Sequence, residues 1–293
     1  MSATQFCIWI VSPPNYPHSR AFDEVALGLR SGFARLGMDV PIVRSPRHLR
    51  GRAIVLGAGL LPKLNLPSLP SDLILFNLEQ VQPNSPWFTA AYLDLLRNFP
   101  VWDYSRQNIR ELRRLGITHV TFCGIGYEPE LSRIPAAEED IDILFYGSIN
   151  ERRKKILDGL LQAGVKLKPL FGLYGEERDA FIARSKIILN IHFYDARVFE
   201  IVRISYLLAN KKFVISEGGD GDEQARRFAP GIVFSRYQKL LDTCLHYLQL
   251  ERERRKIAAR GFQLFAQHFQ AEFLREALNR TKTNHVSKKT ELF

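Results

Sequence analysis

The chain has 293 residues, of which 46% are hydrophobic and 25% charged, a composition typical of a globular protein that buries a core. It contains no apolar run near the roughly 20 residues of a membrane-spanning helix, which excludes an integral helical membrane protein. Lys and Arg number 41 against 31 Asp and Glu, and the net charge of +10 favours anionic partners: nucleotide phosphates, an anionic membrane surface or nucleic acid.

The first half of the chain alternates strand and helix patterns. Phe6–Val11 is a short apolar run without a preceding basic segment, so we expect a first strand rather than a signal peptide, and a cytoplasmic protein. Ser19–Leu36 carries apolar residues every three or four positions and is followed by Gly37, which predicts a helix. Further β-type runs predict strands at Ala53–Gly57, Leu73–Phe76, Val101–Trp102 and His119–Phe122.

The segment Glu128–Asp140 is polar, contains two prolines and has no periodicity, as is typical of an interdomain linker. The alternation then restarts. Strands are predicted at Ile141–Gly147, Val165–Leu170, Lys186–Ile191, Phe213–Glu217 and Ile232–Phe234, and helices at Glu151–Ala163, Glu176–Ser185, Phe199–Ala209, Tyr237–Leu250 and Glu251–Leu278.

Strands that alternate with helices predict parallel sheets covered on both faces. The fold class is therefore α/β, with two Rossmann-like, doubly wound parallel-sheet domains. We expect an N-terminal domain over residues 1–133, a C-terminal domain over residues 134–278 and a basic, flexible tail over residues 279–293.

The junction after strand Ile141–Gly147 could bind phosphate. Gly147 and Ser148 end the strand, and a helix begins a few residues later. Glycine allows a ligand close to the backbone, and a helix start offers unpaired N–H groups and the positive end of a dipole. Asn150 is the expected N-cap, and Arg152 or Arg153 could bind phosphate oxygens. A strand–turn–helix junction with a solvated basic face explains the same pattern.

A second group of polar residues follows the strand Lys186–Ile191. Asn190, His192 and Tyr194 come at its carboxyl end, the edge where ligands bind in open α/β sheets. Glu200 and Arg203 lie one turn apart near the start of the next helix. The carboxylate could accept both hydroxyls of a ribose, and the arginine could orient it or contact phosphate. A stabilising ion pair at a helix start is the alternative. The glycines in the turn from Glu217 to Asp220 are explained by turn chemistry as well as by a ligand.

Three residues of the first half are candidates for proton transfer. His18 lies just before the first helix, and histidine titrates near neutral pH, as a general base for a hydroxyl should. Asp103 ends a later strand and could orient that histidine, whereas Glu79 ends another strand at the same edge and is a rival base. Each could also be an ordinary cap or turn residue.

Other common chemistries have no motif here. Cys7, Cys123 and Cys244 are far apart, odd in number and match no metal spacing, so we expect buried free thiols and no metal site. The chain has no G-x-S-x-G elbow, phosphate-binding G-x-x-x-x-G-K-[ST] loop, H-E-x-x-H or C-x-x-C motif. The aromatic residues do not interleave with basic ones, which disfavours a nucleic-acid surface.

The second half resembles the C-terminal donor domain of GT-B glycosyltransferases, particularly the group-1-like set typified by spore-maturation glycosyltransferase-like proteins. Three stretches carry the resemblance: DILFYGSINERRKKIL, IARSKIILNIHFYDARVFEIVRISYLLANKKFVISE and LLDTCLHYLQLERERRKIAARGFQLF. The first half resembles the N-terminal acceptor domain of these enzymes more loosely.

This resemblance implies two domains that face a cleft, a nucleotide-diphosphate sugar as donor, a hydroxyl-bearing acceptor, and no metal or cofactor. Gly147 and Ser148 would face the phosphates, Glu200 would lie near the nucleotide or sugar, and His18 would match a histidine base with Asp103 as its partner. Many retaining members have two glutamates eight residues apart, but Leu208 stands at that distance from Glu200, which leaves inversion or retention open.

Three other functions fit parts of the pattern. A sugar-nucleotide epimerase could use the same fold, and so could a non-catalytic nucleotide-binding protein. The charge of +10 also permits a DNA-modifying transferase. A peripheral position at the inner face of an anionic membrane would suit the same charge, and the oligomeric state is left open.

Overall fold

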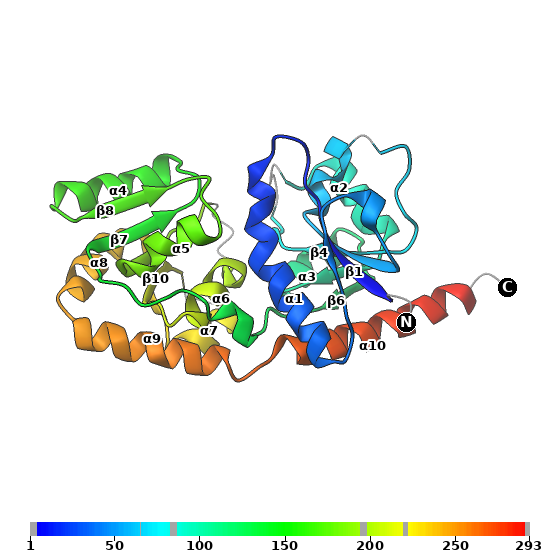
Figure 1. The fold of residues 1–293 in the computed structure, drawn as a ribbon. Coiled ribbons are helices and arrows are strands. Elements are labelled where there is room, and N and C mark those ends of the chain that lie inside the picture. The colour runs from blue at the N-terminus through cyan, green and yellow to red at the C-terminus, as the bar shows by residue number, and fades with distance from the viewer. Residues whose placement is uncertain (1–4, 65, 83–86, 194–197, 219–221, 291–293) are drawn as a thin grey trace. The chain divides into compact units, whose positions relative to one another are not determined.

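The computed structural model describes residues 5–64, 66–82, 87–193, 198–218 and 222–290 (Figure 1). The chain divides into two compact units. Unit 1 comprises Met1–Glu130 and His268–Phe293, and unit 2 comprises Leu131–Gln267.

Unit 1 is built on a parallel sheet that has six strands in the described part of the chain, in the order β2-β1-β3-β4-β5-β6. The strands are β1 (Phe6–Ile10), β2 (Ile42–Val43), β3 (Arg52–Leu56), β4 (Leu73–Asn77), β5 (Val101–Asp103) and β6 (Val120–Phe122). The five strands predicted for this half are confirmed, and the two-residue β2 was too short to show a pattern. The chain moves from β1 to β2 on one side and then to β3 on the other, so its topological switch point lies between β1 and β3.

The helices of unit 1 cover both faces of this sheet. They are α1 (Asp23–Arg35), α2 (Ala90–Asn98), α3 (Arg106–Arg114) and α10 (Gln270–Thr290), with 3-10 turns η1 (Pro17–Phe22), η2 (Pro46–His48) and η3 (Ala58–Leu64). The predicted helix Ser19–Leu36 is thus a 3-10 turn followed by an α-helix. Thr89 caps α2 and Ser105 caps α3, because each hydroxyl accepts a backbone N–H from three residues later.

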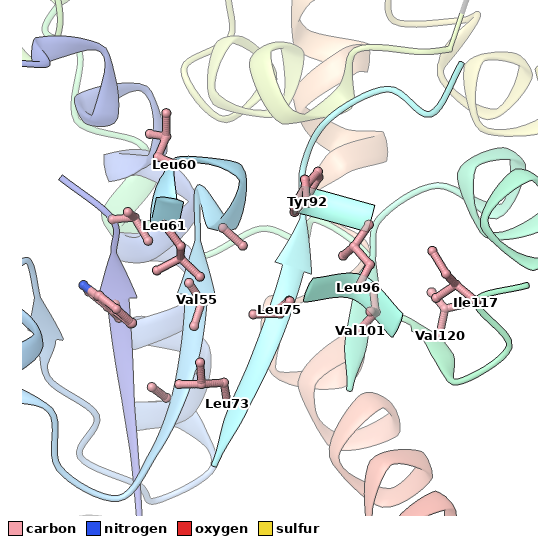
Figure 2. Close-up of a cluster of buried hydrophobic side chains, with 14 of the residues drawn as sticks. Val55, Leu60, Leu61, Leu73, Leu75, Tyr92, Leu96, Val101, Ile117 and Val120 are labelled. Atoms are coloured by element: carbon pink, nitrogen blue, oxygen red, sulfur yellow. The ribbon is translucent and has the colours of Figure 1, made fainter. Parts of the chain in front are cut away.

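The core on one face of the sheet is formed by alternate strand residues and the helices packed over them. Figure 2 shows Leu73 and Leu75 of β4 on the same face, as the two-residue period of a strand requires. Leu96 of α2 is fully buried against them. At about 1.5–3 kcal/mol for each large apolar side chain removed from water, this alternation fixes which face of each strand points inward.

The C-terminal end of the chain differs from the prediction. The expected helix Glu251–Leu278 is two helices, α9 (Glu251–Phe265) in unit 2 and α10 in unit 1. The Gln270 side chain accepts the Gly126 N–H at 2.8 Å and donates to the Gly124 carbonyl at 3.1 Å. A Cβ on Gly126 would lie 2.5 Å from the Gln270 backbone nitrogen, so glycine is required for this approach. Gly32 of α1 likewise packs against α10.

Residues 268–278 therefore belong to unit 1, whereas the sequence placed them in the second domain. The helix also continues to Thr290, where a flexible tail was expected from residue 279. Within it, the Thr281 hydroxyl accepts a hydrogen bond from the Trp102 indole at 2.9 Å. The linker expected at Glu128–Asp140 agrees better with the structure, because residues 132–140 form no helix or strand.

Unit 2 contains a second parallel sheet, with five described strands in the order β11-β10-β9-β7-β8. Its strands are β7 (Ile141–Tyr146), β8 (Leu167–Leu170), β9 (Ser185–Asn190), β10 (Val214–Glu217) and β11 (Val233–Ser235). Besides α9, its helices are α4 (Glu151–Gln162), α5 (Glu176–Ala183), α6 (Ile201–Ala209), α7 (Glu223–Phe228) and α8 (Leu240–Leu248). The switch point of this sheet lies between β7 and β9. The predicted α/β class with two parallel-sheet domains is confirmed.

The three cysteines are buried free thiols, as expected. Burial raises the pKa of Cys244 to about 12, so this thiol stays protonated near neutral pH.

Candidate functional site

The strand–helix junction at the switch point of unit 2 is shaped by two arginines. Gly147 follows β7 with φ +133°, and a Cβ there would lie 3.2 Å from Nη2 of Arg203 and 3.5 Å from Nη1 of Arg153. Asn150 is the N-cap of α4, as predicted, since its Oδ1 accepts the Arg153 N–H at 3.0 Å. The junction therefore joins a glycine, a helix N-terminus and two guanidinium groups.

Arg153 is 2% exposed, and its hydrogen bonds go to backbone carbonyls. Nε and Nη2 donate to the Ile191 carbonyl at 2.9 and 2.5 Å, and Nη1 donates to the Ser148 carbonyl at 2.8 Å. Burial, and next the charge of Arg203, lower the pKa of Arg153 to about 10, so the group remains charged at pH 7. A buried cation held by carbonyls keeps a positive field that an anion can neutralise.

Arg203 lies on the first turn of α6 and reaches back to β7. Its Nη1 donates to the Tyr146 carbonyl at 2.7 Å, and its guanidinium stands 5.1 Å from the centre of the Tyr146 ring. Glu200 occupies the N-cap position of the same helix, but its carboxylate does not cap the helix. The negative charge of Glu200 instead acts on Arg153.

Arg152 has a different environment from the one expected. Its guanidinium forms a two-point ion pair with Glu217, at 2.6 Å between Nη1 and Oε2 and with a second bond from Nη2 to Oε1. It also lies 4.1 Å from the centre of the Tyr237 ring. The fork that could have bound phosphate is thus already occupied by a carboxylate. Glu217 was missed as a site residue, although its position as the last residue of a strand was a signal.

Glu217 also holds the chain that follows β9. Its Oε2 accepts the His192 N–H at 3.1 Å, while Nη1 of Arg152 donates to the His192 carbonyl at 3.1 Å. His192 is 3% exposed, and its Nδ1 has no hydrogen-bond partner among the described atoms. Asn190 is 1% exposed and donates to the Ser216 hydroxyl at 3.1 Å, while its own Oδ1 has no partner in the part of the chain that the structure describes. Tyr194, also expected at this edge, lies outside the described residues.

Unpaired polar atoms that are buried cost about 1–3 kcal/mol each unless a ligand satisfies them. Asn190 and His192 are two positions apart, so their side chains share one face of the extended chain. The printed neighbours of both side chains are in or just after β10, Ser216 for Asn190 and Gly218 for His192. At the switch point of unit 2 the structure brings together Gly147, Arg153 and Arg203, and Arg153 joins this junction to the segment that carries Asn190 and His192 through the Ile191 carbonyl.

The candidate residues of unit 1 occupy the carboxyl edge of its sheet. Asn77 and Asp103 are the last residues of neighbouring strands and register partners. Asp103 is fully buried and accepts hydrogen bonds from Asn77, Asn108 and the backbone of Ser105. His18 is not among these partners of Asp103, and its orientation by Asp103 stays a prediction. Burial raises the pKa of Asp103 to about 8.

Glu79 lies two residues beyond β4. Burial raises the pKa of Glu79 to about 7. Burial and then the negative charge of Glu79 raise the pKa of Tyr16. His18 is half-buried in η1 and packs edge-on against Tyr16, with 5.3 Å between ring centres. Tyr16 therefore interacts with both candidate bases, with His18 through a ring contact and with Glu79 through its charge.

In the residues that the structure describes, no cluster of three or more His, Cys, Asp or Glu could hold a metal ion. Within the same part of the chain, every helix is too short or too polar to cross a bilayer.

Sequence comparison finds relatives without a stated activity. No model of a protein family matches the chain. Uncharacterized protein L140 of Acanthamoeba polyphaga mimivirus is 29% identical over 186 residues, which cover 60% of this chain and 59% of that protein. Uncharacterized protein L138 of the same virus is 31% identical over 114 residues, or 38% of this chain and 13% of the relative. The matched part of the chain therefore covers 59% or less of the length of each of these relatives.

Solved structures of glycosyltransferases share the fold. Anabaena Alr3699/HepE in complex with UDP and glucose matches 99% of this chain and 100% of its own, with a TM-score of 0.60 and 10% identity. AviGT4, a glycosyltransferase involved in avilamycin A biosynthesis, matches 95% and 97% with a TM-score of 0.57 and 13% identity. WaaG, a glycosyltransferase involved in lipopolysaccharide biosynthesis, matches 93% and 98% with a TM-score of 0.59 and 10% identity.

At these identities the likeness concerns the fold alone. Both parallel-sheet units take part in it, because the matches extend over nearly the whole chain. The chain has the GT-B fold of these enzymes.

Proposed function

We propose that this protein is a glycosyltransferase that moves a sugar from a nucleotide-diphosphate donor to a hydroxyl acceptor without a metal ion. The observation that carries the proposal is the meeting of Arg153 and Arg203 at Gly147, at the switch point of unit 2. A solved protein of the same fold is described in complex with UDP-glucose, which supports a uridine nucleotide as a first choice of donor.

In the proposed reaction, the acceptor hydroxyl oxygen forms a bond to the anomeric carbon of the donor. The bond from that carbon to the phosphate oxygen breaks, and the nucleoside diphosphate leaves with the electron pair. The hydroxyl proton passes to a base. Arg153, Arg203 and the N-terminus of α4 would stabilise the charge on the leaving diphosphate, which is the role of a metal ion in other transferases.

The remaining residues of unit 2 would fix the rest of the donor. Glu200 would accept hydrogen bonds from ribose or sugar hydroxyls. Asn190 and His192 have unpartnered buried atoms that could bind polar groups of the nucleotide or sugar. Arg152 would act indirectly, by holding the His192 segment through Glu217. Unit 1 would bind the acceptor.

A thermal-shift screen with UDP, UDP-glucose and GDP-mannose tests the proposal. A nucleotide at about 100 times its dissociation constant should stabilise unit 2 by roughly 2.7 kcal/mol. Arg203→Ala should abolish this shift, whereas Arg255→Ala, in an exposed ion pair on α9, should preserve it. The proposal is wrong if the wild type is not shifted by any nucleotide or nucleotide sugar.

Product analysis separates the proposed function from its rivals. A transferase releases nucleoside diphosphate and forms a new glycoside when an acceptor is present. An epimerase would convert the donor sugar without any acceptor, and a non-catalytic protein would bind the nucleotide without turnover.

We also propose that this protein is cytoplasmic and meets its acceptor at an anionic membrane surface. Support comes from α3, whose Ile109 and Leu112 are buried against the sheet. The outer side of the helix exposes four arginines, and the next residue, Leu115, is 44% exposed. The exposed arginines are Arg106, Arg110, Arg113 and Arg114.

Vesicle flotation would test this surface. Arginines near an anionic bilayer contribute about 1 kcal/mol each. The double variant Arg110→Gln, Arg113→Gln should lose roughly tenfold or more in binding to phosphatidylglycerol vesicles. Arg252→Gln with Arg255→Gln, two exposed arginines of α9, is the matched control. Equal binding by the two variants, or equal binding of wild type to phosphatidylcholine vesicles, would contradict this surface.

A further inference from the structure

The backbone of Glu79 is held from both sides by two buried asparagines. Asn77 Nδ2 donates to the Glu79 carbonyl at 3.0 Å, and Asn77 Oδ1 accepts the Glu79 N–H at 3.3 Å. Asn108 Nδ2 donates to the same carbonyl at 2.9 Å, and its Oδ1 accepts the Val81 N–H at 3.0 Å. The backbone of residues 79–81 therefore cannot move without breaking this set of bonds.

Asp103 links the two asparagines to each other. Its Oδ2 accepts from Asn77 Nδ2 at 2.6 Å, and its Oδ1 accepts from Asn108 Nδ2 at 3.2 Å. Asn77, Asp103 and Asn108 are all 0% exposed. The Tyr92 hydroxyl completes the cluster with a bond to Asn77 Oδ1 at 2.9 Å.

Glu79 is partly exposed as a residue, unlike Asn77, Asp103 and Asn108. Glu79 follows the last residue of β4 by two positions, at the carboxyl edge of the sheet, and its negative charge contributes to the raised pKa of Tyr16. In open α/β sheets, ligands bind at this edge. The cluster therefore fixes the backbone of one carboxylic acid at this edge.

We propose that Glu79 is the residue of unit 1 that binds the acceptor hydroxyl and takes its proton, and that Asp103 is a positioning residue that acts on Glu79 through Asn77 and Asn108. This assignment rests on the proposed glycosyltransferase function. The proton moves from the hydroxyl to the Glu79 carboxylate as the oxygen–carbon bond forms, and afterwards to water. His18 is then not the base, and Asp103 orients Glu79 in place of His18.

The rate of donor hydrolysis, with water as the acceptor, tests the assignment in the full chain. The donor is whichever of UDP-glucose, UDP-N-acetylglucosamine and GDP-mannose gives the largest thermal shift. The carboxylate must be ionised to accept a proton, and since burial raises the pKa of Glu79 to about 7, the wild-type rate should rise through that pH. Glu79→Gln should lower the rate about 100-fold or more and remove this rise, with nucleotide affinity unchanged.

Asp103→Asn tests the positioning role. It places an amide N–H group opposite Nδ2 of Asn77, so that two donors face each other and the Glu79 segment shifts. The rate should fall about tenfold and the midpoint of the pH profile should move, while nucleotide affinity stays the same. Asn108→Ala, which leaves Asp103 in place, should act in the same direction. Asp94→Asn, at an exposed site on α2, is the matched control and should change neither quantity.

The outcomes distinguish a failure of the proposed function from a failure of the roles assigned to Glu79 and Asp103. If no nucleotide sugar binds or is hydrolysed, the proposed function fails and this assignment fails with it. If the wild type is active and Glu79→Gln is equally active, the base is assigned wrongly although the function stands. If Glu79→Gln is inactive while Asp103→Asn and Asn108→Ala keep the wild-type pH profile, the positioning role is wrong.

Discussion

The buried carboxyl of Asp103 makes the stability of unit 1 depend on pH. Burial raises its pKa from an ordinary 3.8 to about 8, so between these values the folded protein binds a proton that the unfolded chain releases. The free energy of unfolding must then fall as pH rises through this window, since the slope has the sign of the protons bound by the unfolded state minus those bound by the native state.

The size of the effect follows from the same shift. One carboxyl lowers the free energy of unfolding by at most about 1.4 kcal/mol for each pH unit within the window. From 3.8 to about 8 the ceiling is roughly 6 kcal/mol, a value that already includes the lowering of the pKa by the hydrogen bonds from Asn77, Ser105 and Asn108. In Asp103→Asn this contribution is absent, so the stability difference between wild type and variant should shrink as pH rises from 5 to 8.

Tryptophan fluorescence provides a selective assay. The three tryptophans, Trp9, Trp87 and Trp102, all belong to unit 1, so urea unfolding followed by their emission reports on this unit. Unfolding curves at pH 5, 6.5 and 8 for wild type, Asp103→Asn and the exposed control Asp94→Asn give the difference directly. A pH-independent difference between wild type and Asp103→Asn would refute the argument, because it would show that Asp103 titrates alike in both states.

Two glycine substitutions give further predictions. Gly147→Ala should lower the free energy of unfolding by about 1–3 kcal/mol, because φ at this position is +133°. It should also weaken UDP binding tenfold or more by displacing the guanidinium of Arg203, as measured by thermal shift and titration. The control Gly164→Ala has a positive φ but no neighbour within 4 Å, so it should lose stability and keep its UDP affinity; equal UDP affinities of the two variants would contradict the site. Gly126→Ala should destabilise unit 1 by about 1–3 kcal/mol, because its Cβ would lie 2.5 Å from the backbone nitrogen of Gln270; an unchanged urea midpoint by tryptophan emission would show that α10 does not depend on this approach.

Local sequence patterns determined much of the fold. The alternation of short apolar runs with helical periodicity predicted the strands correctly in both halves, because burial of one or both faces leaves a period that a sequence shows directly. The Gly-Ser junction after β7 and the N-cap Asn150 were also visible, since both depend on residues a few positions apart.

Contacts between residues distant in the sequence were not predictable in this way. Arg152 was expected to bind phosphate, but it forms an ion pair with Glu217, which lies 65 positions away in the sequence. Likewise, Asp103 meets Asn77 because parallel pairing places the last residues of β4 and β5 side by side, 26 positions apart. No local pattern encodes such a partner.

The end of the chain shows the same division. Sequence periodicity correctly indicated helical residues from Glu251 onward, but it gave no reason to end one helix at Phe265 and begin another at Gln270. That break follows from hydrogen bonds of Gln270 to a segment 144 and 146 positions earlier, made possible by a glycine without a side chain at the point of contact. The sequence by itself determined which segments are strands and helices, because that information lies in periodicity. Only the tertiary structure decided which unit receives the last helix and which charged groups are already paired, because those outcomes depend on contacts that form when the sheets assemble.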